Sequence, residues 1–216
     1  MSEATPVTRV LSKHRAEALV DGIYAVAMTL LVLELKIPES AVFHSAAEFH
    51  AQLLHLIPKF VAWLISFFIL ALFWISHQRA FHYLRVIDMR LLWIQIYSLL
   101  FASLLPFSSA LVGEHAQYFA AQVFYAANMA ALALLAVWQI SYLEAHPNLC
   151  DPAVPWYVAK GARFRCWSIV AVAALALVIA SFAPPFGTLA FALMAVLARV
   201  GRRIEARGAA REAATG

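Results

Sequence analysis

Three side chains in this sequence combine useful chemistry with a helical spacing: Asp21, Trp74 and His77. Asp21 lies near the start of a membrane-length apolar run, where a charge is costly and commonly faces protein or a water-filled path. A carboxylate in such surroundings needs a hydrogen-bond donor or takes up a proton. Because Trp74 and His77 are three residues apart, they share a helix face, and an indole and an imidazole could both donate to Asp21. The set suits a clamp between helices or a proton relay.

The composition predicts the elements that must position these side chains. The chain is 64% hydrophobic and 13% charged, which is typical of a protein that has a bilayer as its solvent. About 20 apolar residues cross a membrane as a helix, and six such blocks lie at residues 19–37, 58–76, 91–112, 117–138, 164–183 and 186–201. We therefore expect an all-α membrane protein with six transmembrane helices in one domain, residues 1–203. A disordered cytoplasmic tail is expected at residues 204–216.

The basic residues predict the orientation of these spans. Of the 16 Lys and Arg residues, all but Lys36 and Lys59 lie on one side: before the first block, in or beside alternate linkers, and at or beyond the end of the last block. Cytoplasmic loops are enriched in Lys and Arg, so both termini are expected in the cytoplasm, with the chain in the cell membrane. The net charge of +4 follows from this topology and does not indicate a nucleic-acid partner.

Helical phase divides the first span into faces. At about 100° per residue, Leu19, Leu30 and Leu33 fall within about 40° of Val26, with Gly22 and Ile37 in the same stripe. Asp21 lies about 140° away from Val26. From the residues alone, the stripe suits lipid contact or helix packing as well as a path for ions.

Three segments resemble the transmembrane protein 175 family of potassium channels. The family's first helix begins Arg-x-x-x-Phe-Ser-Asp, and this chain matches it at Arg15 and Asp21 but has Leu19 and Val20 in place of Phe and Ser. The second span ends like the family's Trp-x-x-His-His-Arg-x-Phe, with matches at Trp74, His77, Arg79 and Phe81, and with Gln78 in place of the second His. Residues 104–107, Leu-Leu-Pro-Phe, resemble a third family element.

This resemblance implies a potassium-preferring cation channel, assembled as a homotetramer around the first helix of each subunit. Carried over by position, the constricting apolar layers are Val26, Leu30 and Leu33, with Thr29 on the shoulder of the stripe. Arg15, Asp21, Trp74 and His77 would then form a structural motif. The implied partners are K⁺ and the bilayer, and no cofactor is implied.

Two other functions stay open, and enzyme chemistry is not indicated. A proton-coupled secondary transporter could use Asp21 and His77 as a relay, although no inverted repeat supports it. A non-conducting relative is compatible with Leu19 and Val20. The eight histidines are scattered, no His-Glu-x-x-His or phosphate-binding Gly loop occurs, and no metal site is expected.

Overall fold

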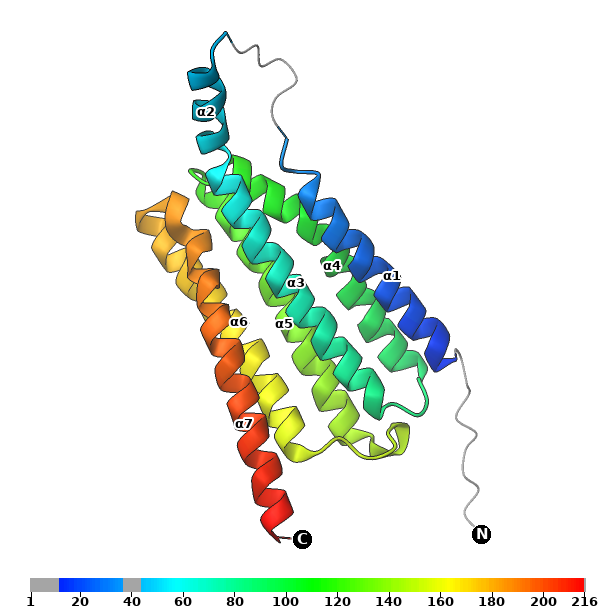
Figure 1. Ribbon diagram of the computed structural model, residues 1–216. Coiled ribbons are helices and arrows are strands. Elements are labelled where there is room, and N and C mark those ends of the chain that lie inside the picture. The colour runs from blue at the N-terminus through cyan, green and yellow to red at the C-terminus, as the bar shows by residue number, and fades with distance from the viewer. Residues whose placement is uncertain (1–11, 37–43, 216) are drawn as a thin grey trace, which may run out of the picture.

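The computed structural model describes residues 12–36 and 44–215, which form a bundle of helices (Figure 1). Among the described residues, Leu84 and Cys150 form an isolated antiparallel β-bridge. The elements are α1 (Lys13–Val32), α2 (Ala46–His55), α3 (Ile57–Tyr83), α4 (Met89–Glu114), α5 (Phe119–Ala145), η1 (Pro147–Leu149), α6 (Trp156–Phe182), η2 (Pro184–Leu193) and α7 (Met194–Thr215). The all-α expectation is confirmed for the described residues.

Five segments of the described chain are long and apolar enough to cross a membrane: α2 with α3, then α4, α5, α6, and η2 with α7. The first expected span is the exception. Helix α1 ends at Val32, and it carries Lys13, Arg15, Glu17 and Asp21. These charges lower the mean hydropathy of α1. By length and hydropathy, α1 is therefore not among the five described helices that could cross a membrane. The end of the expected first block, residue 37, lies outside the described residues.

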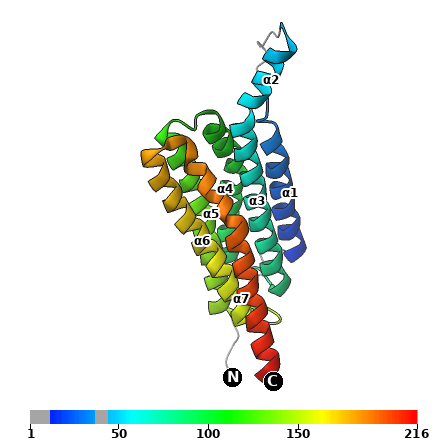
Figure 2. The same cartoon turned by 60° about the vertical axis from the view of Figure 1, so that its left-hand side comes forward.

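The helices alternate in direction, and neighbours in sequence pack side by side. Helix α1 packs on α3 and α4, α4 packs on α5, α5 on α6, and α6 on η2 and α7. In Figure 1, α1 forms one edge of the bundle and the α6–α7 pair the other. Figure 2 shows α2 projecting beyond the end of the bundle where α3 begins.

Local chemistry explains several helix starts and one close seam. Asp88 Oδ1 accepts the amide of Leu91 at 2.9 Å and caps α4, while Ser45 caps α2 in the same way. Pro58 lies in the first turn of α3, where its missing N–H costs nothing. Helices α5 and α6 pack on each other, and both bury small side chains of the kind that let backbones approach closely: Ala126, Ala133, Ala136, Ala173, Ala176 and Ala180.

The C-terminal segment differs from the expectation. The last span starts as the 3-10 helix η2 at Pro184, and α7 continues through the expected disordered tail to Thr215. Three contacts that composition does not reveal hold it against the bundle. Glu205 Oε2 accepts from Arg79 at 2.9 Å and Glu205 Oε1 accepts from Arg165 at 2.5 Å, and Gly208 lies directly against Tyr157.

Candidate pore-lining helix and its carboxylate clamp

Helix α1 presents two unlike faces. One face is buried against α3 and α4 and consists of Ala16, Val20, Tyr24, Ala27 and Leu31. The opposite face leaves large apolar side chains uncovered in the subunit, with exposed fractions of 46% for Leu19, 55% for Val26, 41% for Leu30 and 53% for Leu33. The helical period separates the two faces, because residues three or four apart point the same way. We call the second face the α1 stripe.

Thr29 lies beside the α1 stripe and is exposed. Its hydroxyl lies 2.8 Å from the carbonyl oxygen of Val26 and 3.1 Å from that of Ala25, so it donates to its own helix. The hydroxyl proton is thereby committed, while the oxygen keeps a lone pair for water or a cation. Thr29 directly precedes Leu30, one of the apolar layers that the sequence predicts.

Asp21 ties α1 to α3. The indole Nε1 of Trp74 donates to Asp21 Oδ1 at 2.8 Å, and the amide Nε2 of Gln78 donates to the same oxygen. Trp74 and Gln78 are four residues apart and so lie on one face of α3. The carboxylate points away from the α1 stripe and toward its scaffold. We call Asp21, Trp74 and Gln78 the carboxylate clamp.

The structure brings Trp74 to Asp21 but leaves His77 elsewhere, which corrects the expectation that His77 is the second donor. His77 is buried at 4% exposure, and its ring packs against Tyr24 with centroids 5.4 Å apart. Its Nδ1 and the Tyr24 hydroxyl have no hydrogen-bond partner among the described residues. On α3 His77 lies about 100° from Gln78, and only Gln78 faces the carboxylate. Gln78 was overlooked because it replaces a family histidine.

Arg15, the fourth residue of the expected motif, stays apart from the clamp. It is exposed at the start of α1, and within residues 12–36 and 44–215 its guanidinium forms no hydrogen bond or ion pair. Arg15 also lies about 120° around the helix from Asp21, which prevents direct pairing on α1. Its side chain is free to reach water or lipid headgroups.

A second polar network, which the sequence analysis missed, joins α3, α4 and α5 inside the bundle. Ser66 Oγ lies 2.9 Å from both Ser109 Oγ and the hydroxyl of Tyr125, and all three side chains are buried. Asn128 also donates to Ser108 Oγ at 3.2 Å. In the sequence, these residues could have been identified as isolated polar side chains within apolar spans. Asn128 Oδ1 has no partner among the described residues. The hydrogen bonds that do form join α3, α4 and α5 to one another.

Known proteins match this arrangement. The family model described as endosomal/lysosomal potassium channel TMEM175 matches residues 15–106, which contain the clamp, most of α1 and the Leu-Leu-Pro-Phe element except its last residue, Phe107. A potassium channel of Streptomyces collinus is 30% identical over 161 residues, covering 70% of this chain and 74% of that protein. The chain belongs to the TMEM175 family. Its bacterial relatives are named as potassium channels, so membership supports a channel and not an enzyme.

Two further TMEM175 proteins extend the comparison. The crystal structure of a lysosomal potassium-selective channel TMEM175 homolog from Chamaesiphon minutus superposes with a TM-score of 0.70, at 24% identity, over 88% of this chain and 97% of that chain. At that identity the likeness shows the shared fold. The endosomal/lysosomal proton channel TMEM175 of Gallus gallus is 32% identical over 114 residues, which are 50% of this chain and 22% of that protein. Relatives in the family therefore carry the names of two different ions.

Proposed function

We propose that this chain forms a potassium-preferring cation channel whose pore is lined by α1. The α1 stripe carries the proposal: its large apolar side chains are uncovered in the subunit although α1 is held firmly to α3 by the carboxylate clamp. A single subunit contributes one such helix, and a ring around an axis needs several copies. We assign four, with both termini in the cytoplasm and the chain in the cell membrane.

The apolar layers of Val26, Leu30 and Leu33 control permeation in this proposal. Their Cα atoms span about 10 Å of helix at 1.5 Å per residue. An apolar constriction gates by dewetting, and an ion that enters it must shed part of its hydration shell. K⁺ holds its water less strongly than Na⁺, so the barrier favours K⁺. Selectivity from desolvation alone is modest.

A second candidate is the proton, because vertebrate relatives are named proton channels. Asp21 on α1 and His77 on α3 are protonatable side chains inside the bundle. Flux through purified protein in liposomes separates the candidates. Downhill K⁺ flux that exceeds Na⁺ flux without an imposed proton gradient supports the potassium channel. Cation flux that strictly follows the proton gradient supports a coupled transporter, and proton flux without K⁺ flux supports a proton channel.

Cysteine accessibility tests the lining directly. In a Cys150→Ser/Cys166→Ser background, Val26→Cys and Leu30→Cys should react with a charged, membrane-impermeant thiol reagent. Leu31→Cys is a buried control on the same helix, at 1% exposure.

Phe68→Cys is the sharper control, because Phe68 is 58% exposed in the subunit, much like Val26 at 55%, but lies on α3. If Val26 faces water and Phe68 faces lipid, only the first cysteine reacts. Equal reactivity of Val26→Cys and Phe68→Cys would refute the lining assignment.

A further inference from the structure

A groove runs between α3 and the η2–α7 segment. Its central part has a cavity volume of about 630 Å³, with Leu64, Phe68 and Ile75 of α3 on one wall and Ala195 and Ala198 of α7 on the other. The alanines leave the space that larger side chains would fill. We call this hollow the α3–α7 groove.

The length of the groove matches one leaflet of a bilayer. Leu64 and Ile75 are eleven residues apart, which is about 16 Å along α3. Half of a typical hydrocarbon core is about 15 Å. The walls stay uncovered in the subunit, since Phe68 is 58% and Ile75 41% exposed. An extended acyl chain has the length and the apolar surface to cover them.

One end of the groove is positively charged. Arg199 and Arg202 line it, and none of the described acidic side chains does. Within the described part of the chain, neither guanidinium has a hydrogen bond or ion pair. The nearest carboxylate further along α7, Glu205, is committed to Arg79 and Arg165. Arg pairs with phosphate oxygens in bidentate fashion.

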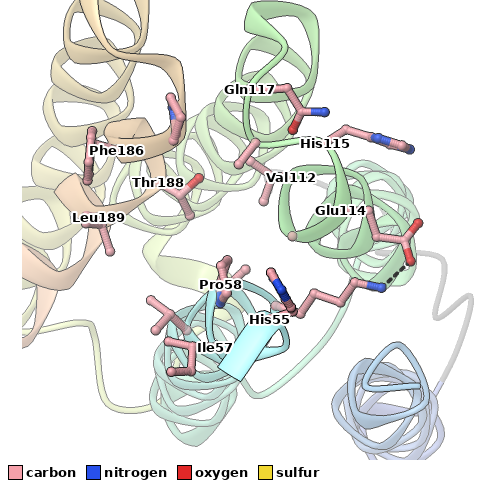
Figure 3. Close-up of a pocket in the computed structure, with 16 residues that line it drawn as sticks. His55, Ile57, Pro58, Val112, Glu114, His115, Gln117, Phe186, Thr188 and Leu189 are labelled. Carbon is pink, nitrogen blue, oxygen red and sulfur yellow. Dashed lines mark hydrogen bonds and ion pairs between the residues drawn. The ribbon is translucent and has the colours of Figure 1, made fainter. Parts of the chain in front are cut away.

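A second hollow lies at the start of α3, and its described lining lacks an uncommitted positive charge of this kind. Figure 3 shows Ile57 and Pro58 of α3 across that hollow from Phe186 and Leu189 of η2. The lysine at its rim, Lys59, is neutralised by Glu114, with Nζ and Oε1 2.5 Å apart. Of these two hollows, the described residues offer an anionic headgroup uncommitted guanidinium groups only at the arginine end of the α3–α7 groove.

We propose that the α3–α7 groove binds an anionic phospholipid, with its phosphate on Arg199 and Arg202 and one acyl chain along Leu64, Phe68 and Ile75. The cytoplasmic leaflet is the negatively charged one, and the orientation proposed above places these arginines there. The site requires neither a pore on α1 nor a preference for K⁺.

The test measures thermal unfolding of purified full-length protein in neutral detergent with added phosphatidylglycerol or phosphatidylcholine of identical acyl chains. Phosphatidylglycerol should raise the unfolding temperature, with the rise following its concentration by mass action. Arg199→Gln/Arg202→Gln should weaken the apparent affinity about tenfold or more, the effect of losing charge-assisted hydrogen bonds. Arg203→Gln/Arg207→Gln removes the same charge from positions of α7 outside the groove and should respond as the wild type does.

Two more variants keep the result interpretable if the arginines also support folding. Arg199→Lys/Arg202→Lys retains the charge and should retain most of the response, whereas Ala195→Trp fills the groove with both arginines intact and should lose it. The proposal fails if phosphatidylglycerol stabilises Arg199→Gln/Arg202→Gln as much as its control, or if Ala195→Trp responds fully. Disulfide cross-linking between copies of Phe68→Cys in delipidated protein would place a second subunit in the groove and would also overturn it.

Discussion

Replacing Trp74 with Phe tests the carboxylate clamp, because the change removes the donor and keeps an aromatic ring in place. Trp74 Nε1 lies 2.8 Å from Asp21 Oδ1, and Gln78 donates to the same oxygen. After Trp74→Phe, Asp21 keeps one of its two donors. The perturbation is therefore confined to one hydrogen bond and the smaller ring.

The expected cost follows from the charge of the acceptor. A hydrogen bond to a charged group contributes about 1.5–3 kcal/mol, and Asp21 is only partly buried, so we expect about 1.5 kcal/mol. Trp63→Phe on the same helix provides the control. Trp63 is also partly buried, but its Nε1 has no partner among the described residues. Removing that unsatisfied donor should cost little beyond lost contact area.

The measurement is the free energy of unfolding in mixed micelles, followed by far-UV circular dichroism as the denaturing detergent increases. The difference between Trp74→Phe and Trp63→Phe isolates the hydrogen bond. A double-mutant cycle with Gln78→Leu should give a coupling energy of at least about 0.5 kcal/mol, since both donors share Oδ1. Equal losses in the two tryptophan variants, with no coupling to Gln78, would mean that the clamp does not stabilise the subunit.

Three further substitutions probe the stripe and the last helix. Leu30→Ala should widen an apolar layer and raise the Na⁺ to K⁺ flux ratio in liposomes, and an unchanged ratio would remove Leu30 from the path. Gly22→Ala adds a methyl group that meets no atom within 4 Å in the subunit, so helix propensity should stabilise the monomer by up to about 1 kcal/mol. If this variant also lost assembly or flux, we would infer that a neighbouring subunit packs against Gly22. Gly208→Ala should instead destabilise the protein, since its methyl carbon would lie 2.2 Å from Tyr157 Cβ, and unchanged unfolding would argue against packing of α7 on α6.

The apolar blocks predicted where the helices lie, because a helix that crosses a bilayer needs about 20 apolar residues. They did not predict where the helices end. The second block was expected to end at residue 76, whereas α3 continues to Tyr83. Polar residues such as Arg79 and His82 lower the local hydropathy there, yet Phe81 is buried at 2% exposure and holds the helix against the bundle. Tertiary contact of this kind is invisible in a hydropathy average.

Helical phase predicted which residues of α1 share the exposed stripe. It did not predict which residue of α3 contacts Asp21. The predicted stripe residues Leu19, Val26, Leu30 and Leu33 are all exposed on one side of α1. The partner of Asp21 required the rotation of α3 as well. Both His77, three residues from Trp74, and Gln78, four residues from it, fit a shared face. The chemistry of imidazole and the family resemblance favoured His77. In the structure His77 packs on Tyr24, and the amide of Gln78 donates to Asp21 instead.

The carboxylate clamp and the α1 stripe are opposite consequences of one helix rotation. Asp21 lies about 140° from Val26, so holding the carboxylate against α3 turns Val26 and Leu30 outward. A register shift of one residue would rotate α1 by about 100° and carry the stripe toward the scaffold. Fixing the rotation therefore needs a directional contact, which apolar packing alone does not supply. Two donors that converge on one oxygen supply that direction, and this explains why a costly charge is retained in the first helix.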